Sequence, residues 1–200
     1  YRNEEAELRP FYSAWPRELL TNKSATGACW PGLTQELAVY QASIGNPPVE
    51  FGESFVVTGQ QPALFTGPLY TVYKIATAIR LAKEISKRHG ICCTPVFWQG
   101  SDDHDFEEAR SATVLTKNHE PLTLTYEPMH DVAGLPMYRV PLDNSVHDLV
   151  DRAADATPGS EFRDEVRAFL HGSLSAASSL ADWSARIIAR LFAGSGLVVF

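Results

Sequence analysis

The sequence predicts an α/β fold in which a parallel sheet is interrupted by an inserted subdomain of short antiparallel strands and helices. Two short apolar runs, residues 55–57 and 92–98, flank a helical pattern over residues 68–88. A strand, a helix and a second strand within about fifty residues form a βαβ unit, whose strands are parallel and whose crossover is right-handed. Shorter strand-like and helical segments then follow residue 112, which indicates the insertion.

The composition excludes several classes of protein. The chain has 200 residues, of which 44% are hydrophobic, so it can form a real core and is not disordered. A net charge of −7 argues against a nucleic-acid-binding surface. No apolar run has transmembrane length and no signal peptide is recognisable, so we expect a cytoplasmic protein with no membrane partner. Three cysteines, in positions 29, 92 and 93, indicate neither a disulfide framework nor a zinc site.

The N-terminal region is assigned as an arm and a short helix over residues 1–50. Residues 1–31 show little periodicity, although their tryptophans and prolines suggest an extended arm that lays aromatic side chains on a core. Thr34 is expected to be the N-cap of a helix that ends near Ile44. Residues 51–112 are then assigned as the first half of the parallel core.

The first strand and the long helix are joined by a polar loop. β-Branched and aromatic residues at 55–57 favour a strand that is buried on both faces, and Gly59 is expected to end it by taking positive φ. Pro68 suits the first position of the helix that follows. One face of that helix is apolar and packs on the sheet, with Val72, Ile75, Ile79, Ala82 and Ile85 at helical spacing.

The loop after the first strand is a candidate ligand site. Its polar side chains suit a polar ligand, and the free N–H groups at the start of the helix favour phosphate or carboxylate. Lys74 lies within two turns of that helix start. An ordinary strand-to-helix connection is the alternative, because most glycine-bearing loops of this kind bind nothing. The polar loop residues are Thr58, Gln60, Gln61 and Thr66.

A second polar segment follows the second strand, where residues 102–108 hold five carboxylates and one imidazole. Because ligands collect at the carboxyl ends of parallel strands, we expect this segment to converge with the first loop. His104 is then a general acid or base whose tautomer a neighbouring carboxylate fixes. Two alternatives remain. Asp103, His104 and Asp105 could be the ligands of a divalent metal, or the acidic side chains stabilise the N-terminus of a short helix through its dipole.

Residues 113–194 are assigned as the insertion and residues 195–200 as the start of the next core strand. His119, His130 and His147 are expected at the surface without partners. A buried strand is a poor place for a domain to end, so we expect the chain to be part of a longer protein. The predicted strands of the insertion are Thr113–Thr116, Leu122–Tyr126 and Met137–Val140, and its predicted helices span about 145–154, 160–170 and 174–192.

Two long motifs carry a resemblance to a known family. They are Val-Thr-Gly-Gln-Gln-Pro-Ala-Leu-Phe-Thr-Gly-Pro-Leu-Tyr-Thr-Val-Tyr-Lys at 57–74 and Pro-Val-Phe-Trp-Gln-Gly-Ser-Asp-Asp-His-Asp-Phe-Glu-Glu at 95–108. The chain resembles the N-terminal part of the bacillithiol biosynthesis cysteine-adding enzymes, which are cysteine ligases. The resemblance implies a Rossmann-like core, similar to class I synthetases and nucleotidyltransferases, with connecting-peptide insertions and a later coiled coil for dimerisation.

The resemblance also implies an activity and a set of site residues. The reaction joins the carboxyl of cysteine to the amine of glucosaminyl malate, with ATP as the expected cofactor and a homodimer as the full-length form; no metal is assigned. On this basis the catalytic residues are Asp103, His104 and Asp105. The substrate-binding residues are Thr58, Gly59, Gln60, Gln61, Thr66, Gly67, Lys74 and Trp98.

Two other functions compete with the ligase. A metal-dependent hydrolase or phosphoesterase would use the Asp-Asp-His-Asp segment at 102–105 and would contain bound metal. A non-catalytic assembly module would instead use the apolar stripe of the helix over residues 180–191 to bind a partner. The two long motifs favour the ligase.

Overall fold

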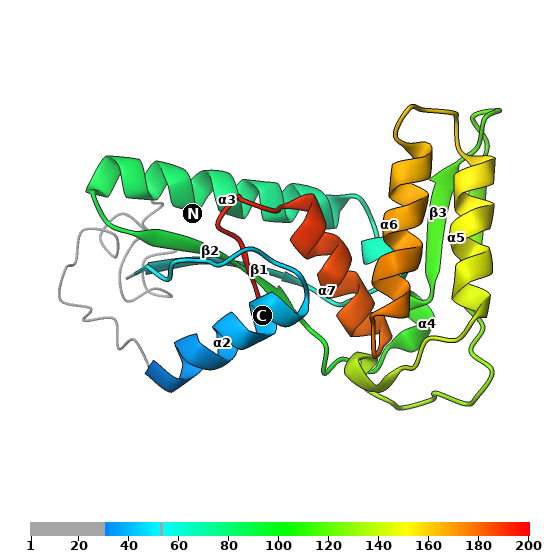
Figure 1. Cartoon of the computed structure of the whole chain (residues 1–200), viewed down its shortest axis with the longest axis horizontal. Coiled ribbons are helices and arrows are strands. Elements are labelled where there is room, and N and C mark those ends of the chain that lie inside the picture. Colours follow the sequence, from blue (N-terminus) through cyan, green and yellow to red (C-terminus); the bar gives the residue numbers. More distant parts are fainter. Residues whose placement is uncertain (1–30, 53) are drawn as a thin grey trace, which may run out of the picture.

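The computed structural model describes residues 31–52 and 54–200, so the expected arm over residues 1–30 lies outside the described residues. Two sheets are present in the described part (Figure 1). The larger sheet has the strand order β1-β2-β5, with β2 parallel to both neighbours. The predicted parallel sheet is therefore confirmed, including the return of the chain to it at its last strand. These strands are β1 (Ser54–Gln60), β2 (Cys93–Gln99) and β5 (Val198–Val199).

Strand β1 is longer than expected, and Gly59 has a different role from the predicted one. The strand continues through Gly59 to Gln60, and Gly59 is not among the residues with positive φ. A Cβ atom on Gly59 would lie 2.9 Å from the backbone oxygen of Trp98 on β2. Glycine is thus required here by the close approach of two paired strands rather than by a turn.

Only one face of β1 is covered, which corrects the expectation of burial on both faces. Phe55 and Val57 are 54% and 59% exposed, whereas Val56, on the other face, packs against buried residues of α3. A run of apolar residues in a strand does not reveal how many faces receive a helix, because that depends on elements elsewhere in the chain.

Helix α3 (Tyr70–His89) packs on the sheet through the predicted stripe, and Ile75, Ile79, Ala82 and Ile85 are buried. It begins two residues later than expected. A 3-10 turn, η2 (Leu64–Thr66), precedes it, and the N–H of Thr71 donates to the carbonyl of Pro68 at 2.9 Å. The helix ends at Gly90, which has φ 65°.

Helix α2 (Pro31–Ser43) lies beside β5. The expectation that Thr34 is its N-cap is wrong, because the helix already includes Thr34. Proline at the first helical position explains the earlier start, since a helix leaves that N–H unpaired in any case.

The insertion begins with a two-stranded antiparallel sheet, β3 (Ser111–Leu115) and β4 (Pro121–Thr125). The short helix α4 (Phe106–Ala109) precedes it. The predicted third strand is wrong, because the segment forms a 3-10 turn, η3 (Met137–Arg139). Met137 is fully buried in this turn, so its apolar pattern reflects burial in the core and not membership of a sheet.

Three helices complete the insertion: α5 (Ser145–Ala156), α6 (Arg163–Ser175) and α7 (Leu180–Leu191). The single helix expected over residues 174–192 is wrong. Leu174 belongs to α6, and Ser179 starts α7 by accepting a hydrogen bond from the N–H of Asp182 at 3.1 Å. No helix of the described part is both long and apolar enough to cross a membrane.

Helix α7 connects the two larger hydrophobic cores of the described part of the chain (Figure 1). Leu180 and Trp183 pack in the core of the insertion, whereas Ala185 and Ile188 pack with α3 and β2 in the core of the parallel sheet. Most of the stripe that suggested partner binding is therefore buried inside this chain, whereas Leu191 at its end is 57% exposed. Both cores share this one helix.

Candidate functional site

Lys74 defines the first part of the candidate site. From the second turn of α3 its Nζ reaches back to the carboxyl end of β1, where it donates to the backbone oxygen of Gly59 and to Oε1 of Gln60, at 3.2 Å from the latter. The ammonium also lies 5.5 Å from the ring centroid of Tyr70. These contacts hold one positive charge at the strand end, close to the start of the helix.

An open depression of about 390 Å³ lies between β1 and α3. Thr58 and Lys74 line it, and among the described lining residues Lys74 alone is charged. The other walls include the exposed side chains Val57, Tyr70 and Tyr73. This surface can hold a ligand that combines an anionic group with a body that packs on aromatic rings.

The turn η2 holds Phe65 and Thr66 in the left-handed backbone region, with φ 51° and 69°, and Gly67 follows with φ 76°. Side-chain-bearing residues rarely adopt this conformation, so surrounding contacts must maintain it. The ring of Phe65 packs edge-on against Trp183 at a centroid distance of 5.5 Å. Thr66 is buried, and the N–H groups of Thr66 and Gly67 already donate to carbonyls of the same turn.

The second predicted segment, around His104, is built by backbone contacts. Oδ1 of Asp105 accepts from the N–H of Glu108 at 3.3 Å and so caps α4. Oδ1 of Asp103 accepts from the N–H of Asp105 at 3.0 Å, and the carbonyl of Asp103 accepts from Met137 at 2.8 Å. Asp105 thus has the role that the helix-terminus alternative predicted, and Asp103 fixes the loop that precedes the helix. His104 is exposed.

His104 shares a depression with residues that the sequence did not indicate. Together with Asp105 it lines an open depression of about 400 Å³, which is also lined by His130 and Asp131 from the segment after β4. Arg110 spans the rim, with ion pairs to Glu107 at 3.0 Å and Glu127 at 2.7 Å. No group of three His, Cys, Asp or Glu side chains among residues 31–52 and 54–200 is arranged to hold a metal ion, so the metal alternative gains no support.

The two strand ends meet as predicted, but their candidate side chains do not share one cavity. Gln60 pairs with Gln99 in the sheet register, and the N–H of Gly100 donates to the carbonyl of Gln60 at 3.1 Å. Lys74 and His104, however, line different depressions. Of the other predicted residues, Gln61 is half-buried after β1, and Trp98 is half-exposed with its ring 4.6 Å from that of Phe200.

Two buried oxygens near this edge were also missed by the sequence analysis. Oγ1 of Thr71, in the first turn of α3, and Oε1 of Gln99, at the end of β2, have no hydrogen-bond partner in the described part of the chain. The Nε2 of Gln99 donates to the carbonyl of Ala181 at 2.7 Å. Unpaired buried oxygens are uncommon and often mark a bound water or ligand.

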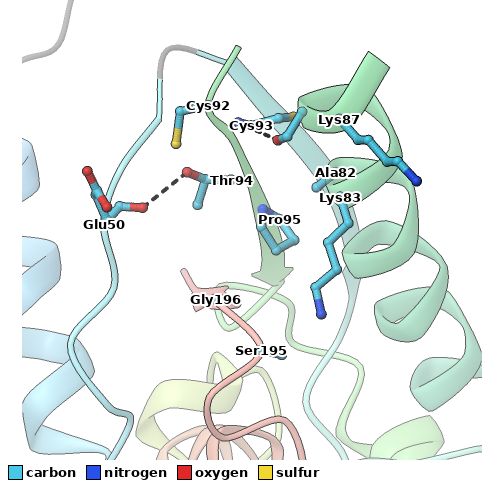
Figure 2. A pocket seen from close by; sticks show the side chains of 11 residues that line it. Glu50, Ala82, Lys83, Lys87, Cys92, Cys93, Thr94, Pro95, Ser195 and Gly196 are labelled. Carbon is cyan, nitrogen blue, oxygen red and sulfur yellow. Dashed lines mark hydrogen bonds between the residues drawn. The ribbon is translucent and has the colours of Figure 1, made fainter. Parts of the chain in front are cut away.

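A larger cavity, of about 490 Å³, lies at the opposite end of the sheet (Figure 2). Lys83 and Lys87 of α3 line it with Cys92 and Cys93, close to the amino end of β2. Burial, followed by the charge of the neighbouring Cys92, raises the pKa of the Cys93 thiol. Ligands of parallel sheets collect at the carboxyl ends of the strands, so size alone does not make this cavity the better candidate.

Comparison with known proteins agrees with the fold and with both motifs. Residues 51–200 match the model of the family described as "Bacillithiol biosynthesis BshC, N-terminal Rossmann-like domain". A relative from Salinibacter ruber, named "Putative cysteine ligase BshC", is 42% identical over 143 residues, which is 72% of this chain and 26% of the relative. A protein of the same name from Natranaerobius thermophilus is 39% identical over 144 residues, again 72% and 26% of the two chains.

The chain thus spans about a quarter of the length of the curated relatives that it matches. The match includes the strand-loop-helix unit with Lys74, the segment around His104 and the insertion up to β5. By this match the chain belongs to the BshC family of bacillithiol biosynthesis and carries its N-terminal Rossmann-like domain.

Proposed function

We propose that the protein is a ligase that joins the carboxyl of cysteine to the amine of glucosaminyl malate, the last step of bacillithiol biosynthesis. Its family and the name of its relatives support a cysteine ligase. The observation that carries the proposal is the position of Lys74, whose ammonium lies at the carboxyl end of β1 beside the N-terminus of α3.

Lys74 is proposed to bind an anionic group of a substrate. A lysine ammonium has three N–H donors, and in this structure two of them are directed to Gly59 and Gln60. The third remains for a carboxylate or phosphate oxygen, whose charge the helix N-terminus also favours. The malate carboxylates fit this position, with Tyr70 and Tyr73 as walls for the rest of the ligand.

ATP is the proposed cofactor, because amide formation requires an activated carboxylate and ATP supplies that activation when bound. Lys74 and the α3 N-terminus have the charge that a phosphate group requires.

His104 is proposed to accept the proton of the attacking amine. Its side chain is exposed and lines the depression that is also lined by His130. Asp103 and Asp105 fix the loop that carries it, because their carboxylates accept hydrogen bonds from backbone N–H groups. A base must be held within hydrogen-bond reach of the proton that it removes. In this proposal the two carboxylates position the loop, and the imidazole carries out the proton transfer.

Other parts of the proposal rest on the family resemblance alone. They are that the full-length protein works in the cytoplasm and that it dimerises through a coiled coil. Size-exclusion chromatography with light scattering tests the second, and a monomer at micromolar concentration would contradict it.

Mass spectrometry of the reaction products formed by the full-length protein tests the ligase proposal. Cysteine and glucosaminyl malate are supplied with ATP, and the condensed thiol is the expected product, together with AMP or ADP. The same mixture without ATP is the control. Failure to form the thiol under conditions in which both substrates bind would overturn the proposal.

A further inference from the structure

A cavity of about 260 Å³ lies within the insertion, between α5, α6 and β3. Helices α5 and α6 lie side by side there (Figure 1). The apolar lining includes Val114, Val150, Ala153 and Leu170, and Phe65 of η2 reaches it from the first candidate loop. This space is separate from both depressions of the proposed active site.

Two arginines of α6 give this apolar space an unusual feature. The Nε atoms of Arg163 and Arg167 are buried and have no hydrogen-bond partner in the described part of the chain, although that of Arg167 lies 3.5 Å from Oδ1 of Asp151, and both residues line the cavity. Leaving a charged donor unpaired away from water is costly, so such groups call for an acceptor. Half of the four unpaired buried side-chain atoms among the described residues thus belong to the lining of one cavity.

The charges at this cavity do not cancel. Arg167 is paired with Asp155 and lies 3.5 Å from Asp151, which also receives a hydrogen bond from His171. Arg163 has no ion pair within the described residues, and its Nη2 donates only to the carbonyl of Thr157 at 3.0 Å. One cation therefore remains without a counterion beside an apolar space.

We propose that this cavity binds a small carboxylate with an apolar chain, held by Arg163. The carboxylate supplies the negative charge that the guanidinium of Arg163 lacks, and the chain fills the space between Val150, Ala153 and Leu170. The occupant contacts Phe65 and so supports the left-handed backbone of the loop that carries Thr66 and Gly67. This site goes beyond the proposed ligase function and does not depend on it.

Calorimetric titration with three probes tests the chemistry of the ligand. Hexanoate is expected to bind, and butanoate, which is two methylenes shorter, about fifteenfold more weakly, because each buried methylene contributes about a fourfold factor. Hexanamide has the same shape without the charge and is expected to bind at least tenfold more weakly than hexanoate. Equal affinity for hexanoate and hexanamide, or no binding of hexanoate, would overturn the proposal.

Three variants test the location of the site. Arg163→Met removes the charge but keeps an unbranched apolar stem and is expected to weaken hexanoate binding at least tenfold, whereas Arg152→Met, at an exposed position on α5, leaves it unchanged. Ala153→Leu fills the cavity and is expected to abolish binding without lowering the melting temperature. Unchanged affinity in both Arg163→Met and Ala153→Leu would show that hexanoate binds elsewhere and would refute the site.

Discussion

The side-chain amide of Gln41 pairs with both backbone groups of Val199. Nε2 donates to the carbonyl at 2.7 Å, and Oε1 accepts from the N–H at 3.0 Å. A helix side chain thus takes the place of a neighbouring strand at the outer edge of β5. Asn46 adds a hydrogen bond from Nδ2 to the carbonyl of Leu197 at 2.9 Å. Because unpaired strand edges recruit further strands, these two residues close this edge of the sheet.

Replacing Gln41 by leucine is expected to lower the free energy of unfolding by about 3 kcal/mol, because both backbone groups of Val199 then stay buried without partners. Urea denaturation measures the change. Gln35→Leu, at an exposed position on the same helix, is the matched control and is expected to have little effect. Equal losses in the two variants would contradict the edge-closing role.

The variant Gly59→Ala is expected to lower the free energy of unfolding by about 2 kcal/mol, because its Cβ would press on the Trp98 carbonyl of the paired strand. Gly172→Ala, in α6, is the control. Apart from its chain neighbours and the backbone of its own helix, no atom of the described residues lies within 4 Å of its added Cβ, and alanine favours a helix over glycine by about 1 kcal/mol. The melting temperature should therefore fall in Gly59→Ala and rise in Gly172→Ala. A lower melting temperature in both variants would contradict strand crowding as the cause.

The variants His104→Ala and Asp105→Ala separate the proposed proton transfer by His104 from the structural role of Asp105 as the cap of α4. Loss of the α4 cap in Asp105→Ala is expected to reduce stability by about 1 kcal/mol. His104→Ala leaves an exposed position and is expected to keep stability while lowering turnover about a hundredfold or more. Ligase assays on the full-length protein measure the rate, and unchanged turnover in His104→Ala would sink the base assignment.

Replacing Lys74 by methionine is expected to weaken binding of glucosaminyl malate at least tenfold, because a charge-assisted hydrogen bond is lost. Calorimetry on the full-length protein measures the affinity. Lys83→Met, on the same helix but at the cavity at the amino end of β2, should bind as well as the wild type. If the two variants bind equally well, Lys74 is not the anion anchor.

Asp143 predicts a pH dependence of stability. Burial by itself raises the pKa of its carboxyl, but hydrogen bonds from Ser145, Met129 and Tyr126 outweigh this and hold the pKa below its usual range. A lowered folded-state pKa stabilises the fold above the unfolded-state pKa, and this contribution is lost as the pH falls through the folded-state value.

The variant Asp143→Asn is therefore expected to be less stable than the wild type at pH 7, and this difference in stability should narrow as the pH falls below the usual range of a carboxyl group. Denaturation at several pH values measures it. Asp148→Asn, at an exposed position in the first turn of α5, is the control. A difference that stays constant from pH 7 to pH 3 would contradict the assignment.

The parallel sheet was predictable because its signals are local. The apolar runs and the helical stripe around Ile75 and Ile79 define each element, and the chirality of crossovers then fixes how they connect. The same signals failed at Met137, where burial without a sheet produced a strand-like pattern, and at Leu174, where a four-residue break between two helices has little effect on periodicity.

The candidate site was predictable only in part. The convergence of Gln60 and Gln99 follows from parallel pairing, and it was expected. The sequence does not indicate that His130 and His104 line the same depression, because only the folding of the insertion brings the two residues together. His147 was likewise expected to be a lone surface residue, yet its Nδ1 lies 2.7 Å from that of His171.

By itself, the sequence determined the α/β class, the parallel strands, the family and the two polar segments that follow the strands. Only the tertiary structure decided that Lys74 bends back to Gly59, that Phe65 reaches the cavity beside Arg163 and that Gln41 closes the edge at Val199. The physical reason is the range of the interactions. Backbone propensity and hydrophobic periodicity act between residues close in the chain, whereas side-chain hydrogen bonds and cavities depend on segments that meet only after the core has packed.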